Sequence, residues 1–190
     1  LVTLLCNNLA KSSEEDLRLL MVQEEPLKFT ATMITHLESL DQLCFAIQVF
    51  LVVPIMSHLC GLSDCSIFMV GNIARVLRYL LFGLSTQRWM VLLSVTVGSF
   101  VIASLPAAKS LLSNSVQEHE VGTIFSFISL MESIGSLFAA LIFNTLYKIT
   151  HVYYVGIPFL ILAFVAIVVL LFSAYSLYHM KSSRLRKIEE

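Results

Sequence analysis

The sequence has few charged residues, and its longest uncharged segment decides the class of protein. Asp, Glu, Lys and Arg make up only 13% of the 190 residues, about half of the roughly 25% found in soluble domains. Residues 149–180 contain none of the four. As one helix, residues 152–180 would be ~43 Å long, more than the ~30 Å hydrocarbon core of a bilayer. This segment is therefore predicted to cross a membrane, and a soluble fold is excluded.

Other absences narrow the function classes. The net charge of −1 provides no basic surface for nucleic acid. The four cysteines match no zinc pattern, and the five histidines show no metal-ligand spacing. A glycine-rich phosphate loop, a nucleophile elbow and a paired-carboxylate hydrolase pattern are all missing. We therefore expect no enzyme, no metal and no cofactor. The chain starts with Leu and lacks a signal peptide pattern, so we expect a fragment of a longer protein.

Apolar segments recur along the chain, separated by short polar turns. Each stays apolar for about 20 residues or more, whereas membrane β-strands would alternate over about ten. The mean hydropathy is +0.85. The sequence thus predicts an all-α membrane protein with helices at about residues 33–59, 66–85, 89–112, 121–147 and 152–180. Residues 181–190 carry four basic side chains and are predicted to form a cytoplasmic tail.

The first 29 residues allow two interpretations. Residues 1–10 could end a helix, with residues 11–29 as a cytoplasmic loop; or residues 1–23 could form a sixth spanning helix. In the loop interpretation, five Lys and Arg residues of the loops and helix ends lie on the cytoplasmic side of the membrane and five on the other side. In the six-helix interpretation, five lie on the cytoplasmic side and three on the other side. The positive-inside rule favours the second, with a cytoplasmic C-terminus.

Three segments carry a resemblance to a known family. Trp89-Met90 opens one helix, which continues through LPAAKSLLSNSV at residues 105–116. Two later segments are Glu120-x-Gly-x-x-Phe-Ser with Glu132-Ser-x-Gly, and Phe143-Asn-x-x-Tyr-Lys-x-Thr with Gly156-x-x-Phe-Leu. These resemble helices ten to twelve of major facilitator transporters, and in particular solute carrier family 46, the family of the proton-coupled folate transporter.

The resemblance implies a fold and a function. Residues 1–180 would form the C-terminal six-helix half of a twelve-helix major facilitator fold, with a separate N-terminal half as partner. The activity would be secondary active transport of small organic anions, such as folate-like solutes, with protons. The membrane would be the plasma or the lysosomal membrane. The alternative is a truncated membrane protein that does not transport and acts as a scaffold or regulatory partner.

Ionisable residues at membrane depth are functional candidates, because burying a charge in hydrocarbon is costly. Lys109 follows Pro106, which removes a backbone hydrogen bond. It could attract an anionic solute or balance a carboxylate, or it could extend to the cytoplasmic interface. Glu132 could carry a proton or form an inter-helix hydrogen bond. Arg75 and Arg78 share a helix face. We expect them to pair with a carboxylate or water, since the resemblance makes their helix peripheral.

The segment KSSEEDLR at residues 11–18 concentrates charge in the first predicted helix. Its two serines have capping-box spacing to Glu15 and Asp16, so a new helix could begin here within the membrane. Two ion pairs between residues four apart, Lys11–Glu15 and Glu14–Arg18, are possible within this helix. One of the three acids would then have no cationic partner, and Asp16 is the first candidate for that acid. An unmatched acid would take up a proton readily. We therefore expect Glu14, Glu15 and Asp16 to line the cavity and couple protons, unless the segment is a solvated loop.

Overall fold

The computed structural model describes residues 2–25, 27–56, 63–113, 120–151 and 153–189, and within these ranges the chain is helical and contains no β-strand. The last residues of the predicted helix 33–59, 57–59, and the polar segment 114–119 lie outside the described residues. The elements in chain order are α1 (Val2–Gln23), α2 (Ala31–Ile47), η1 (Gln48–Val52), α3 (Asp64–Gly83), α4 (Arg88–Gly98), η3 (Ser99–Ala103), α5 (Ser104–Ser113), α6 (Val121–Thr150) and α7 (Ile157–Glu189).

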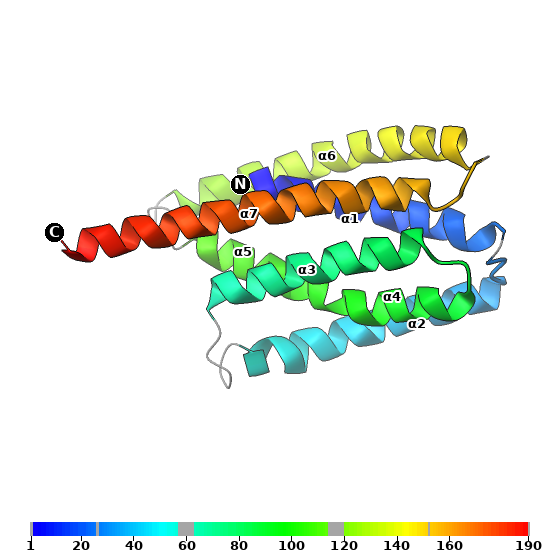
Figure 1. The fold of residues 1–190 in the computed structure, drawn as a ribbon, viewed down its shortest axis with the longest axis horizontal. Coiled ribbons are helices and arrows are strands. Elements are labelled where there is room, and N and C mark those ends of the chain that lie inside the picture. Colours follow the sequence, from blue (N-terminus) through cyan, green and yellow to red (C-terminus); the bar gives the residue numbers. More distant parts are fainter. Residues whose placement is uncertain (1, 26, 57–62, 114–119, 152, 190) are drawn as a thin grey trace.

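The helices form an up-and-down bundle (Figure 1). Helices α1, α3 and α6 run in one direction, and α2, α4 with α5, and α7 run in the other. Helix α3 packs against α4, η3, α5 and α7, whereas α1 packs against α6 and α7. Helix α3 thus has neighbours on several sides, and it carries two arginines into the interior of the bundle.

Four helical segments of the described chain are long and apolar enough to cross a membrane: Asp64–Gly83, Arg88–Ser113, Val121–Thr150 and Ile157–Tyr175. The second joins α4, η3 and α5. Helix α1 does not qualify, because the charges of residues 11–18 lower its mean hydropathy. Four such segments make the chain an integral membrane protein.

Two of the predicted helices change their winding partway. Helix α2 passes into the π-helix η1 at Gln48, and α4 passes into the 3₁₀-helix η3 at Ser99. The two irregular segments pack against each other, and the buried Gln48 Nε2 donates to Ser99 Oγ at 3.1 Å. Val101 and Ile102 of η3 line the cleft described below, and η1 packs against η3.

The first helix corrects two of the sequence-based expectations. Helix α1 is continuous from Val2 to Gln23, so residues 11–18 form neither a loop nor the start of a second helix. Ser13 does not cap a new helix, because its Oγ donates to the Leu9 carbonyl oxygen of the preceding turn at 2.9 Å. With that hydroxyl bonded inside the helix, and with Glu14 and Arg18 paired with residues of other helices, nothing interrupts the helix here.

Helix α7 begins at Ile157, later than the predicted residue 152, and continues through the predicted tail to Glu189. Pro158 suits the first turn of a helix, where its missing N–H leaves no hydrogen bond unmade. The preceding turn closes tightly on the end of α3, since the Tyr154 hydroxyl donates to the Gly83 carbonyl oxygen at 2.8 Å. The Phe82 and Phe159 rings stack beside it with centroids 5.1 Å apart.

The exterior of the bundle is more apolar than the surface of a soluble protein. Large apolar side chains are exposed on the outer helices, for example Leu137 and Leu141 of α6 and Phe164 and Leu171 of α7. Several polar and charged side chains are buried instead: Asn7, Ser13, Glu14, Arg18, Gln48, Asn72, Arg75 and Arg78. Lipid can solvate the apolar exterior, whereas the buried polar groups require partners inside the protein.

We predict that Gly156→Ala destabilises the fold, because a methyl group there would overlap the Gly83 carbonyl oxygen and the Tyr154 ring. The expected cost is about 1–3 kcal/mol, measured as a lower Tm of the purified protein in detergent. Gly122→Ala is the control: a Cβ at Gly122 meets nothing within 4 Å, and alanine favours helix. Equal Tm values for the two variants would contradict the prediction.

Candidate functional site

A cleft of about 420 Å³ opens between α1, α2, α3 and the junction of α4 with η3. Its lining contains eight charged residues, which are Lys11, Glu14, Glu15, Arg18, Glu38, Asp41, Arg75 and Arg78. Four are cationic and four are anionic, so the formal charges cancel. Eight charges around one cleft in a membrane bundle are costly, which makes this cleft the candidate functional site.

Arg78 of α3 pairs with two carboxylates from different helices. Its Nε donates to Glu14 Oε1 of α1. Its Nη1 and Nη2 donate to the two carboxylate oxygens of Asp41 of α2, each at 3.3 Å. The Arg78 and Glu14 side chains are only 9% and 8% exposed. All three nitrogens of this guanidinium therefore have anionic partners.

Arg18 of α1 forms the second half of the network. Its Nη2 donates to Glu38 Oε1 at 2.8 Å, and its Nη1 donates to Asp41 Oδ2. Asp41 thus accepts hydrogen bonds from two arginines, one on α1 and one on α3. This shared carboxylate connects three helices through charge-assisted hydrogen bonds.

Arg75 lies one helical turn before Arg78 and is paired differently. Its side chain lines the cleft, and the residue is 2% exposed. Its Nη2 donates to Ser104 Oγ at 3.4 Å. Its Nε and Nη1 have no hydrogen-bond partner in the described part of the protein, and no acid of that part lies within 4.0 Å. Arg75 is therefore a buried cation without a bound carboxylate.

Two glycines create the space for these arginines. A Cβ at Gly98 would overlap the Arg78 side chain, and a Cβ at Gly71 would overlap Ser104. Gly98 lets Arg78 pass α4 toward α1 and α2. Gly71 lets α3 approach α5 closely enough for Ser104 to reach Arg75.

The predicted site residues differ in burial and in whether they line a hollow of the bundle. Glu14 is buried in the network, and exposed Glu15 lines the mouth of the cleft. Asp16 and Lys109 are exposed and line neither the cleft nor the groove described below. Glu132 lies in that groove.

The predicted pairing was wrong for two residues. Glu14 pairs with Arg78 rather than with Arg18, and Arg18 pairs with Glu38 and Asp41. The i, i+4 rule selects neighbours on the same helix, but here partners on adjacent helices are closer. The expectation of a carboxylate partner is confirmed for Arg78; Arg75 has none within ion-pair distance among the described residues.

Sequence reasoning missed the residues that α2 contributes. Glu38, Asp41 and Gln42 line the cleft from one helix. All three fall within the apolar segment predicted at residues 33–59. The rule that ionisable residues at membrane depth are functional candidates would have found Glu38 and Asp41.

A second hollow, which we call the serine groove, lies between α1 and α6 and measures about 370 Å³. Its lining is Lys11, Ser12, Glu15, Ser129, Glu132, Ser133 and Ser136. Lys11 and Glu15 line both hollows. One polar surface therefore extends from α2 across α1 to α6.

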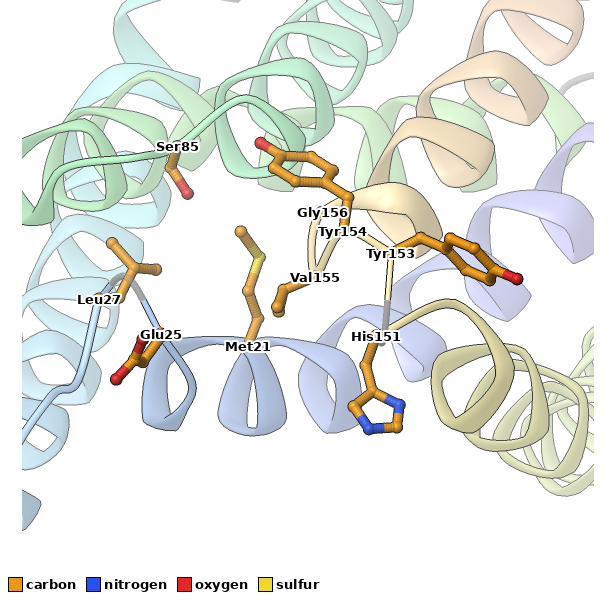
Figure 2. A pocket seen from close by; sticks show the side chains of 9 residues that line it. All are labelled: Met21, Glu25, Leu27, Ser85, His151, Tyr153, Tyr154, Val155 and Gly156. Atoms are coloured by element: carbon orange, nitrogen blue, oxygen red, sulfur yellow. The ribbon is translucent and has the colours of Figure 1, made fainter.

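A smaller pocket of about 170 Å³ lies at the end of the bundle where α1 ends and α7 begins (Figure 2). Met21, Leu27, Val155 and the tyrosines of the turn before α7 give it a mainly apolar lining. Glu25 lines it as well; a hydrogen bond from Lys28 and the charge of that ammonium lower the pKa of the Glu25 carboxyl. This carboxylate already has a cationic partner in Lys28.

We predict different stability effects for substitutions of the two α3 arginines. Arg78→Met leaves Glu14 buried without its partner and should destabilise the protein by about 3–5 kcal/mol. Arg75→Met removes a buried cation that has no carboxylate partner, so it should leave the free energy of unfolding unchanged or raise it. Thermal unfolding in detergent measures both. Equal destabilisation by the two substitutions would contradict the assigned difference in pairing.

The family comparison agrees with this architecture. Residues 20–189 match the family model described as Major Facilitator Superfamily. The matched range begins within α1, includes the cleft residues of α2, α3 and α4, and ends with α7. Members of this superfamily are typically membrane transporters. The chain belongs to the major facilitator superfamily.

Proposed function

We propose that this protein is a proton-coupled transporter of small organic anions and that the described bundle is its C-terminal half. The observation that carries the proposal is the charged cleft, in which Arg78 is shared between Glu14 of α1 and Asp41 of α2. Secondary transporters bind solute and coupling ion near the bilayer midplane, between elements that move relative to each other. A network of exchangeable ion pairs between helices suits that role.

The cations of the cleft support an anionic solute. Three of the four are arginines, whose planar guanidinium matches the geometry of a carboxylate. The likeness of residues 86–165 to solute carrier family 46 points to the same class, with folate-like solutes as examples. The volume of about 420 Å³ lies within the usual range of small-molecule sites.

The carboxylates of the cleft support proton coupling. A proton on Glu14 or Asp41 would cancel one of the two negative charges bound to Arg78 and weaken that ion pair. Glu15 and Glu132 are the further carriers we propose, since both line the polar surface that crosses α1. Asp16 and Lys109 are exposed at positions that a second half could cover, and we retain them as partners for that half.

The polar surface that extends from α2 across α1 to α6 supports the proposal that a second half of the transporter covers it. Lys11, Glu15, Gln42 and Ser133 are exposed on it, and lipid would not solvate them. We propose that an N-terminal six-helix half covers this surface. In that arrangement α1 and α2 also cross the membrane, which makes six spans, and the basic C-terminal segment lies in the cytoplasm.

We predict that residues 1–190 alone do not transport, because one half supplies only one wall of the solute path. Proteoliposomes that contain this chain alone should show no saturable, pH-driven uptake of radiolabelled folate. Co-reconstitution with an N-terminal half is the positive control. Saturable uptake by the chain alone would overturn the half-transporter proposal.

We also predict that Glu14→Gln flattens the pH dependence of folate uptake by the full-length protein. The amide cannot bind and release a proton as the carboxylate beside Arg78 would under this proposal. Asp41→Asn should have a similar effect. Glu24→Gln is the matched control, because Glu24 is an exposed acid just after α1. Uptake is compared at equal surface expression. Wild-type pH profiles for both cleft variants would exclude Glu14 and Asp41 as coupling residues.

A further inference from the structure

The cleft contains one arginine whose hydrogen-bonding capacity is largely unused. A guanidinium has five N–H donors. Arg75 donates one of them to Ser104 Oγ at 3.4 Å, while its Nε and Nη1 have no partner in the described part of the chain. Buried polar groups in proteins are nearly always hydrogen-bonded, so each exception calls for an explanation. A bound ligand that accepts these hydrogen bonds provides one.

The other arginines of the cleft are much less available. Arg78 bonds to carboxylates through all three of its nitrogens. Arg18 bonds to carboxylates through both terminal nitrogens, and only its Nε has no partner. A ligand would have to displace Asp41 or Glu14 to reach either of them. At Arg75 no carboxylate has to be displaced.

The surroundings hold Arg75 in position for a ligand. Ser104 Oγ donates to the Val101 carbonyl oxygen at 2.7 Å, which orients the hydroxyl that accepts from Arg75. The close approach of Gly71 to Ser104 fixes the spacing of α3 and α5. Because Arg75 is one of the residues that line the cleft and its guanidinium is almost fully desolvated, its attraction for an anion within reach is stronger than that of an exposed arginine.

We propose that Arg75 binds a carboxylate group of the solute inside the cleft; this assignment rests on the proposed transport function and names the solute-binding residue. The terminal nitrogens Nη1 and Nη2 can donate to the two oxygens of one carboxylate, since Nη2 keeps a second hydrogen beyond the one given to Ser104. The ligand class is a small molecule with a planar, ionised carboxylate. A neutral amide of the same shape lacks the charge and is rejected.

The test uses benzoate as the probe and thermal unfolding of the purified 190-residue chain in detergent as the readout. A ligand that binds only the folded state raises the Tm. Benzoate should raise the Tm of the wild type in a saturable manner, and benzamide or NaCl at equal concentration should not. Arg75→Lys should keep a weaker response, because lysine retains the charge without the planar geometry. Arg75→Met should lose the response while remaining folded.

Lys148→Gln is the matched control, since it removes an exposed cation at the end of α6 and should keep the full benzoate response. A wild-type response in Arg75→Met, or no response to benzoate in the wild type, would overturn the assignment. This binding assay does not require transport. A benzoate response that depends on Arg75, together with a full-length protein that takes up no anion, would retain the site and reject the transport function.

Discussion

The carboxylate of Asp41 is the point on which the arrangement of the first three helices depends. Its oxygens accept from Arg18 of α1 and from Arg78 of α3. The described residues of α2 have little close backbone packing with α1 or α3, and their close neighbours are α4 and η3. Leu37 of α2 is buried in the apolar core that α1 also enters, and the ion pairs add a charged connection from α2 to α1 and α3. A change in these charges alters the charged part of that contact, whereas the apolar part is unaffected.

Arg75 and Arg78 show how two identical residues one turn apart acquire different roles. Arg78 stabilises the fold, because the buried Glu14 would otherwise lack its cationic partner and Asp41 would keep only Arg18. Arg75 has a hydroxyl as its only hydrogen-bond partner in the described structure. A fold selected for stability alone would replace such a group by an apolar side chain. Local departures from stability of this kind are concentrated at functional sites.

The apolar helices and several charged residues of the cleft could be predicted from the sequence, and the pairing of those charges could not. The segments near residues 66–85, 89–112 and 121–147 required only continuous hydrophobicity, and they correspond to three of the four apolar spans. The partner of Glu14 is 64 positions away on another helix, beyond the reach of any spacing rule. The i, i+4 rule gave the wrong partner because it ranks local pairs without the tertiary structure, and it directed attention to Asp16 instead of Asp41.

The equal numbers of cations and anions around the cleft have a consequence for the energetics of transport. A monovalent anion that entered alone would leave the loaded site with one net negative charge, and moving that charge against a membrane potential costs about 2.3 kcal/mol per 100 mV. If a proton binds one of the lining acids at the same time, the loaded site is neutral, as the unloaded site is. The voltage would then do no work on either form of the carrier. Under the proposed function, the direction of net movement would depend on the proton and solute gradients alone, and transport would continue across a membrane with no electrical potential.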